Sequence, residues 1–255
     1  MAVSGSTRQP SKMVKKFTAL RREIARVRRQ AGVWEVLRRG GTRSLKLARS
    51  LVFSRRQEIH PFDLEHGTDT SGTVDVGALD LPPERADQAV RYQTAIVEVF
   101  TEMLERLPGG GENQVFVDLG SGKGRALLLA SRLPFKEIIG VELSADLHAI
   151  ACRNIAIYRD VGQRCNRIRS LCQDAGSFEY PLEKLVIYLF NPFGEQVMRE
   201  VVSRIEDSLK RNPRRVHVMY LKPLHRQLFD QSEWFEVLQA TERYVIYRSK
   251  ELVPA

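Results

Sequence analysis

Three glycines, Gly120, Gly122 and Gly124, stand at alternate positions in the stretch FVDLGSGKGR, directly after an apolar run that ends in Asp118. Glycine leaves out the Cβ atom where a chain turns sharply or where a ligand approaches the backbone. The free N–H groups at the start of a following helix attract an anionic group such as a carboxylate or a phosphate. The stretch therefore predicts a ligand cradle between a strand and a helix.

The residue after the third glycine distinguishes between the kinds of nucleotide-binding loop to which this stretch could belong. A P-loop has four residues between its glycines and then Gly-Lys-Ser/Thr, whereas Arg125 follows Gly124 here. A dinucleotide loop reads Gly-x-Gly-x-x-Gly/Ala, and Arg125 stands where its third small residue belongs. A nucleoside triphosphatase is therefore disfavoured. An NAD- or nucleotide-binding oxidoreductase is kept as an alternative, although no Ser-Tyr-x-x-x-Lys set for hydride transfer is evident.

Two acidic residues follow later apolar runs. Glu142 ends the run EIIGVE, where its carboxylate could accept hydrogen bonds from both ribose hydroxyls, as it would also do in a dinucleotide enzyme. Asp174 lies in CQDAGSFEY, after the next run, and either contacts the ligand or caps a turn or helix. The five histidines and three cysteines show no metal-ligand spacing, so no metal site is expected.

Apolar periodicity predicts the elements that must position these residues. Strands are expected at residues 115–119, 137–142, 168–172, 185–190, 216–221, 234–239 and 244–248. Helices are expected at residues 92–107, 125–133, 145–160 and 195–209. Alternating strands and helices indicate a doubly wound, mainly parallel sheet, and the last two strands indicate an antiparallel hairpin at its edge. Ligands of such sheets bind outside the carboxyl ends of the strands.

The Gly-x-Gly-x-Gly spacing with a preceding acid resembles motif I of class I S-adenosylmethionine-dependent methyltransferases. As a block, residues 90–222 resemble bacterial-type stand-alone members without an assigned substrate, and VFVDLGSGKGRALLLAS followed by GVELS is similar to the non-SET histone-lysine methyltransferases. The resemblance implies a seven-stranded Rossmann-like methyltransferase fold with S-adenosyl-L-methionine as cofactor. Its implied cofactor-binding residues are Asp118, Gly120, Ser121, Gly122, Gly124, Glu142 on the ribose and Asp174 facing the adenine amino group.

In both groups a segment before motif I covers the cofactor. The resemblance therefore implies that Tyr92 and Thr94 lie near the methionine end of the cofactor, together with residues 69–71. Asp118 would support the glycine loop or the ammonium group of the cofactor. We interpret Lys123 and Arg125 as solvated charges of a first helical turn.

The fourth strand of the predicted sheet ends in YLFNPFG, which is similar to the Asn-Pro-Pro-Tyr/Phe element of amino-methylating members but lacks the second proline. The resemblance implies that Asn191 orients a target nitrogen and that Phe193 packs beside it. A turn that closes the strand is the alternative. The implied reaction is an in-line methyl transfer to nitrogen, in which the protein mainly aligns the atoms. A protein side chain, RNA and a small amine all stay open as the acceptor.

The charge of the chain is concentrated in its first part. Residues 1–56 hold 16 Lys or Arg and two acids, a net charge of +14, whereas the remainder holds 24 basic and 29 acidic residues. We divide the chain into a basic amphipathic helical extension (1–56), a connector or lid (57–89) and the S-adenosylmethionine-binding domain (90–255). The extension packs on the domain, contacts RNA or an anionic membrane surface, or is removed as a targeting segment.

No stretch has the roughly 18–20 uninterrupted apolar residues of a membrane span, and no apolar segment of a secretory signal follows the basic start. With an odd number of cysteines and no Cys-x-x-Cys pair, we expect reduced thiols and a cytoplasmic location. A non-catalytic protein that keeps the cofactor fold and works through its basic extension is a further alternative.

Overall fold

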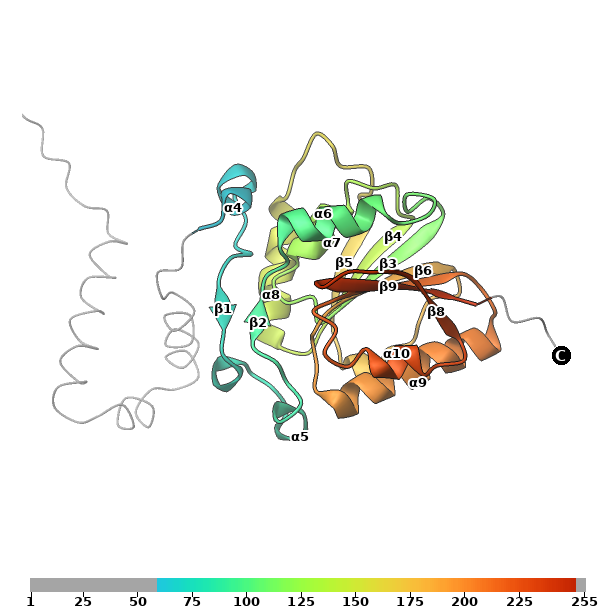
Figure 1. Ribbon diagram of the computed structural model, residues 1–255. Coiled ribbons are helices and arrows are strands. Elements are labelled where there is room, and N and C mark those ends of the chain that lie inside the picture. Colours follow the sequence, from blue (N-terminus) through green and yellow to red (C-terminus); the bar gives the residue numbers. More distant parts are fainter. Residues whose placement is uncertain (1–58, 251–255) are drawn as a thin grey trace, which may run out of the picture. The chain divides into compact units, whose positions relative to one another are not determined.

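The computed structural model describes residues 59–250 (Figure 1). The predicted basic helical extension, residues 1–56, lies outside the described residues. No helix of the described range is both long and apolar enough to cross a membrane.

A seven-stranded sheet forms the centre, with the strand order β5-β4-β3-β6-β7-β9-β8. Its strands are β3 (Gln114–Leu119), β4 (Glu137–Glu142), β5 (Ile168–Cys172), β6 (Lys184–Phe190), β7 (Val216–Leu221), β8 (Phe235–Ala240) and β9 (Tyr244–Ser249). The five strands from β5 to β7 pair in parallel, whereas β9 pairs antiparallel with both β7 and β8. The predicted doubly wound, mainly parallel sheet with an antiparallel C-terminal hairpin is confirmed.

Helices cover both faces of the sheet, with α6 and α7 on one face and α9 and α10 on the other (Figure 1). The main helices are α6 (Val97–Glu105), α7 (Arg125–Ala130), α8 (Ala145–Ile157), α9 (Glu195–Arg211) and α10 (Gln227–Asp230). Side chains of a strand alternate between the faces, so Val115, Val117 and Leu119 of β3 join the core under α9, while Phe116 joins the core under α6 and α7. Six consecutive buried residues in β3 and six in β7 follow from this two-sided cover.

The segment before the sheet has more structure than its lack of periodicity suggests. It contains α4 (Pro61–His66), β1 (Thr73–Val74), η1 (Val76–Ala78), α5 (Pro83–Ala86) and β2 (Tyr92–Gln93). The prediction of a helix over 92–107 is wrong at its start, because α6 begins only at Val97 and Tyr92 pairs with Val74 in a two-stranded ribbon. The hydroxyl of Tyr92 donates to the carbonyl of Thr70 at 2.7 Å, a tertiary contact that overrides the helical spacing of the apolar residues.

Candidate functional site

The glycine loop connects the end of β3 to the start of α7. Gly120, Gly122 and Gly124 have φ angles of 80°, 54° and 88°, the left-handed region in which glycine is favoured. The amide of Gly120 donates to the carbonyl of Val141 at 2.8 Å, which fastens the loop to β4. A Cβ atom at Gly120 would lie 2.7 Å from Cβ of Pro192, and one at Gly122 would lie 2.2 Å from the Tyr92 ring. The glycines therefore allow side chains from two other segments to close onto the loop.

Glu142, at the end of β4, is fixed by this loop. Its Oε2 accepts from the amide of Gly122 at 2.8 Å and its Oε1 accepts from the amide of Ser144 at 2.8 Å. The residue is 8% exposed, and burial raises the pKa of its carboxyl against the opposing effect of these backbone hydrogen bonds. Each carboxylate oxygen can accept a further hydrogen bond, so Glu142 can hold the loop and still bind a ligand hydroxyl.

Asp118 lies on the neighbouring strand, with its side chain on the same face as Phe116 by the alternation of β3. It is 3% exposed, and burial together with the charge of Glu142 raises the pKa of its carboxyl well above the ordinary value of 3.8. Two acids that repel each other when ionised thus lie near the glycine loop. This electrostatic environment favours a positively charged ligand group.

Asp174 has the capping role, one of the two roles that the sequence leaves open. As the N-cap of η2 (Ala175–Ser177), its Oδ1 accepts from the amide of Gly176 at 2.8 Å. Its Oδ2 accepts from Nε of Arg85 in α5 at 2.7 Å, and the residue also lines the cavity described below. The turn role is thus present in the structure, while contact with an adenine group stays a prediction.

Asn191 follows the last residue of β6 and has an unusual backbone. Its φ of 40° lies in the left-handed region, which for a residue other than glycine costs on the order of 1–3 kcal/mol and is typical of functional sites. Its amide oxygen Oδ1 is buried and has no hydrogen-bond partner. Phe193, two residues on, lies with its ring 3.7 Å from the position of a Cβ at Gly120. The turn therefore places an aromatic ring beside the glycine loop and contains a buried acceptor without a partner.

A cavity of about 100 Å³ at the carboxyl ends of β3, β4, β5 and β6 unites most of the predicted site. Of the predicted site residues, those that line it are Tyr92, Gly120, Glu142, Asp174, Asn191 and Phe193. Those that do not line it are Thr94, Asp118, Ser121, Gly122 and Gly124. Ser121 is buried, with its side chain packed over Gly140 of β4, so it supports the loop from behind.

Sequence reasoning missed several lining residues in the connector, because that segment shows no periodicity. Leu79, Leu81, Arg85 and Gln88 line the cavity from this side. Their signal in the sequence is their place in a long stretch without apolar periodicity, since long connecting segments are often binding segments.

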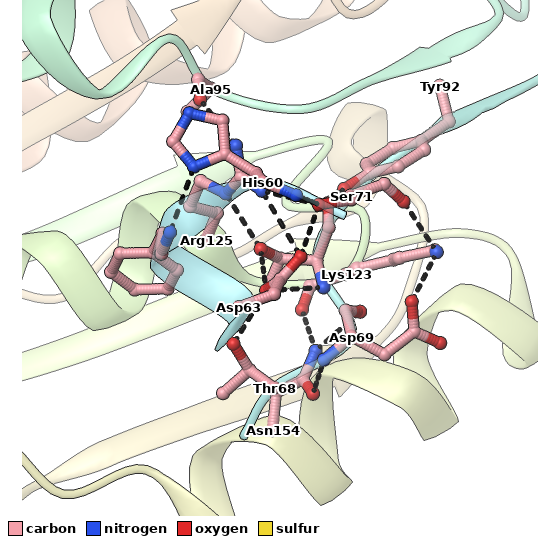
Figure 2. A network of polar contacts seen from close by, with 12 residues as sticks. His60, Asp63, Thr68, Asp69, Ser71, Tyr92, Ala95, Lys123, Arg125 and Asn154 are labelled. Carbon is pink, nitrogen blue, oxygen red and sulfur yellow. Dashed lines mark hydrogen bonds and ion pairs between the residues drawn. The ribbon is translucent and has the colours of Figure 1, made fainter. Parts of the chain in front are cut away.

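The interpretation of Lys123 and Arg125 as solvated charges is wrong. Lys123 is 4% exposed and Arg125 is 2% exposed. Figure 2 shows both side chains turned into a polar network with residues of the connector. The ammonium of Lys123 bonds Asp69 at 2.8 Å and the guanidinium of Arg125 pairs with Asp63 at 3.3 Å. Both cations of the glycine loop are therefore neutralised by acids that lie more than 50 positions earlier in the chain.

Within residues 59–250, no group of three or more His, Cys, Asp or Glu side chains could hold a metal ion. Cys152, Cys165 and Cys172 are free thiols.

No family model matches the chain, and no curated protein matches it. Several solved structures are similar in fold. A putative RNA methyltransferase from Pyrococcus horikoshii is 21% identical, with 61% of this chain and 85% of that one covered and a TM-score of 0.45. An RNA methyltransferase from Salinibacter ruber in complex with S-adenosyl-L-homocysteine is 19% identical, with 64% and 97% covered and a TM-score of 0.42.

A ribosomal protein L11 methylase from Lactobacillus delbrueckii subsp. bulgaricus is 14% identical, with 59% of this chain and 76% of that one covered and a TM-score of 0.41. Similarity at this level carries no argument about the reaction. The function therefore has to be argued from the residues that line the cavity.

Proposed function

We propose that the chain is an S-adenosylmethionine-dependent methyltransferase that transfers a methyl group to a nitrogen acceptor. The observation that carries the proposal is that Gly120, Glu142 and Asn191 line one cavity, where Glu142 is buried and the amide oxygen of Asn191 has no hydrogen-bond partner. A carboxylate fixed by two backbone amides suits a ribose diol, and an acceptor without a partner suits an N–H group of a substrate.

The charges of the loop favour a sulfonium cofactor over a dinucleotide. A pyrophosphate would need free cations or a helix start with unopposed positive charge, whereas Lys123 and Arg125 are both paired with connector acids. Asp118 and Glu142 lie near the same loop, and the pKa of both carboxyls is raised, chiefly by burial. A cationic cofactor lowers the cost of keeping these buried acids ionised, since an opposite charge nearby stabilises the carboxylate.

When bound, S-adenosylmethionine supplies a methyl group that its sulfonium makes electrophilic. Glu142 would hold the ribose, Asp174 would face the adenine amino group, and Tyr92 with Thr94 would lie near the methionine end. Asn191 would accept a hydrogen bond from the acceptor nitrogen and so aim its lone pair, while the ring of Phe193 packs beside it. Alignment of this kind supplies roughly 7–11 kcal/mol of barrier reduction.

We assign catalysis to residues 90–255 and a covering role to residues 57–89. The basic extension, residues 1–56, would contact RNA or an anionic membrane surface, and a cytoplasmic location fits the free cysteines. The acceptor is a protein side chain, RNA or a small amine.

Calorimetry with S-adenosylhomocysteine and with NADH tests the cofactor. We expect binding of the first only, and binding of NADH alone would refute the proposal. Glu142→Ala should lower affinity for S-adenosylhomocysteine by about tenfold or more, as expected when a hydrogen-bonded charged group is lost. Glu137→Ala, at the opposite end of the same strand, where Glu137 pairs with Arg169 on the surface, is the matched control and should change little.

Labelling of cell extract with tritiated cofactor tests the reaction and sorts the acceptor into protein, RNA or small molecules. Asn191→Ala should keep affinity for S-adenosylhomocysteine within about twofold but lose about a hundredfold in transfer rate, because misplacement of the acceptor is that costly. Asn212→Ala, at the exposed end of α9, should behave as the wild type. Full transfer by the Asn191 variant would remove this residue from the site.

A further inference from the structure

A segment far from the glycine loop in sequence contacts the loop through hydrogen bonds and ion pairs. Residues 60–71, here called the clamp, begin with α4, whose N-cap His60 accepts from the amide of Phe62 and whose end is marked by the left-handed Gly67. The side chain of Asp63 is buried. Its Oδ1 accepts from Oγ1 of Thr68 at 2.6 Å, from the amide of Thr70 at 2.9 Å and from Oγ1 of Thr70 at 2.6 Å. Its Oδ2 accepts from the Ser71 hydroxyl (Figure 2).

Arg125, the residue directly after Gly124, forms an ion pair with the Asp63 carboxylate. Its Nη2 lies 3.3 Å from Oδ2 of Asp63, and its Nε donates to Oγ1 of Thr70 at 2.7 Å. The side chains of Asp63 and Arg125 are only 1% and 2% exposed. Each charge of such a buried pair needs its partner in place, because an isolated buried charge at either position would cost several kcal/mol of stability.

Lys123, the residue directly before Gly124, is tied to the same segment. Its Nζ donates to Oδ1 of Asp69 and to the carbonyl of Ser71, both at 2.8 Å. Asn154 of α8 joins the two backbones, since its Nδ2 donates to the carbonyls of Asp69 and Lys123 at 2.9 Å and its Oδ1 accepts from the amide of Asp69 at 2.9 Å. Both neighbours of Gly124 are thus fixed by the clamp.

The same segment reaches Gly122 through Tyr92. The hydroxyl of Tyr92 donates to the carbonyl of Thr70, and its ring lies where a Cβ of Gly122 would stand. The amide of Gly122 in turn donates to Glu142. A continuous chain of contacts therefore runs from Asp63 through Thr70, Tyr92 and Gly122 to Glu142.

We propose that the clamp is an integral part of the cofactor site and that Asp63 is its positioning residue, which sets the glycine loop and thereby Glu142 for cofactor binding. Asp63 does not line the cavity and acts only through Arg125, Thr70 and Tyr92. The inference rests on the proposed function for the identity of the ligand. The shape of the loop in the protein without ligand does not depend on that identity.

Two measurements on the full chain test this role. Hydrogen exchange at the backbone amides of residues 118–126 of the full chain, measured without ligand, reports the shape of the loop. Calorimetry reports the affinity for S-adenosylhomocysteine. In Asp63→Asn we expect exchange about tenfold faster and affinity about tenfold lower, since a displaced supporting group costs at least this much. The control is Asp230→Asn, which removes a carboxylate that Arg226 and the Tyr247 hydroxyl each bind at 2.8 Å, outside both the clamp and the cavity lining. Both quantities should stay within about twofold of the wild type in the control.

A gentler pair of variants keeps the test valid if Asp63→Asn fails to fold. Thr70→Val removes the hydroxyl that links Asp63 to Arg125 while keeping the size of the side chain, and Thr70→Ser keeps the hydroxyl. We expect about three- to tenfold faster loop exchange and weaker binding in the valine variant and recovery in the serine variant.

Unchanged exchange and affinity in Asp63→Asn or Thr70→Val would overturn the inference. Absence of S-adenosylhomocysteine binding by the wild type would refute the proposed function. Faster loop exchange in the variants would still support the clamp in that case, so the two failures are distinguishable.

Discussion

The two halves of the segment before α6 are attached to the domain in different ways. The clamp is held by Asp63 and Arg125, whose side chains are 1% and 2% exposed. Residues 79–93, here called the cover, line the cavity and are held by Arg85, which bonds Asp174 at 2.7 Å and Glu200 of α9 at 2.8 Å. These three side chains are 21%, 25% and 34% exposed.

The difference in exposure predicts that the ion pairs of the clamp contribute more to stability than those of the cover. Water screens a partly exposed ion pair, so its net contribution is about 0–1 kcal/mol, whereas removal of one partner of a buried pair costs about 3–5 kcal/mol. The cover has further hydrogen bonds to the domain: the amide of Gly194 donates to the carbonyl of Gln88 at 2.7 Å, and the Ser144 hydroxyl and the amide of Asp146 donate to Asp80. We therefore assign the lid role proposed for residues 57–89 to the cover, and a fixed supporting role to the clamp.

The largest expected effect is on the free energy of unfolding. Asp63→Ala should lower it by about 3–5 kcal/mol, because the guanidinium of Arg125 is left buried without its counter-charge. Glu200→Ala should lower it by about 0–1 kcal/mol, because Arg85 keeps Asp174 and contact with water. Urea unfolding of both variants measures the two values. Equal losses would remove the distinction between clamp and cover.

The pH dependence of this difference is the second prediction. Burial alone would raise the pKa of the Asp63 carboxyl, but hydrogen bonds from Ser71, Thr68 and Thr70 outweigh burial and hold the pKa below its ordinary value of 3.8. The unfolded chain therefore takes up the proton first as the pH falls, so stability from Asp63 is complete above about pH 4 and is lost as the pH falls through the folded pKa.

Urea unfolding of the wild type and Asp63→Asn over a pH series checks the sign. Their stability difference should be constant from about pH 7 to pH 5 and narrow below about pH 4. A difference that stays constant down to about pH 3 would mean that Asp63 does not titrate with folding.

The same contrast explains which parts of the molecule could be predicted from sequence. Strands such as β4 and β7 were predicted at their observed bounds because burial on both faces produces runs of apolar residues. The clamp could not be predicted, because Asp63 meets Arg125 from 62 positions away and no local spacing records such a pairing. The charges of Arg125 and Lys123 were therefore read as solvated.

The candidate site shows the same limit. Gly120, Glu142 and Asn191 follow strand ends, and strand ends of a parallel sheet meet at one edge, so their convergence on the cavity follows from the predicted topology. Tyr92 also lines the cavity. Its position there depends on a hydrogen bond to Thr70 and a ring contact with Gly122, neither of which follows from the resemblance to other proteins. Because these contacts hold Tyr92 outside the helix, α6 begins at Val97 and not at the predicted residue 92.

The third prediction concerns opening of the cover. Arg85→Gln should speed dissociation of S-adenosylhomocysteine by about threefold to tenfold, the effect of roughly 1 kcal/mol from a partly exposed pair. Higher salt should speed dissociation from the wild type and change it less in the variant, because the ions screen the Arg85 pairs.

Stopped-flow displacement at about 0.05 and 0.5 M KCl measures both dissociation rates. Arg106→Gln is the control, since Arg106 pairs with Glu102 on α6 and does not line the cavity. A dissociation rate that changes neither in Arg85→Gln nor with salt would mean that the Arg85 ion pairs do not hold the cover.

The smallest expected effect lies at Tyr92, the residue that joins clamp and cover. Burial raises the pKa of its hydroxyl, which therefore stays protonated and donates to Thr70. Tyr92→Phe removes only this bond and should cost about 1 kcal/mol of stability and less than about threefold in affinity for S-adenosylhomocysteine. Tyr92→Ala removes the ring from Gly122 as well and should cost more than about tenfold in affinity. Equal and large losses of affinity in the two variants would show that the hydroxyl, and not the ring contact, transmits the position of the clamp to the loop; wild-type affinity in both would exclude Tyr92 from this role.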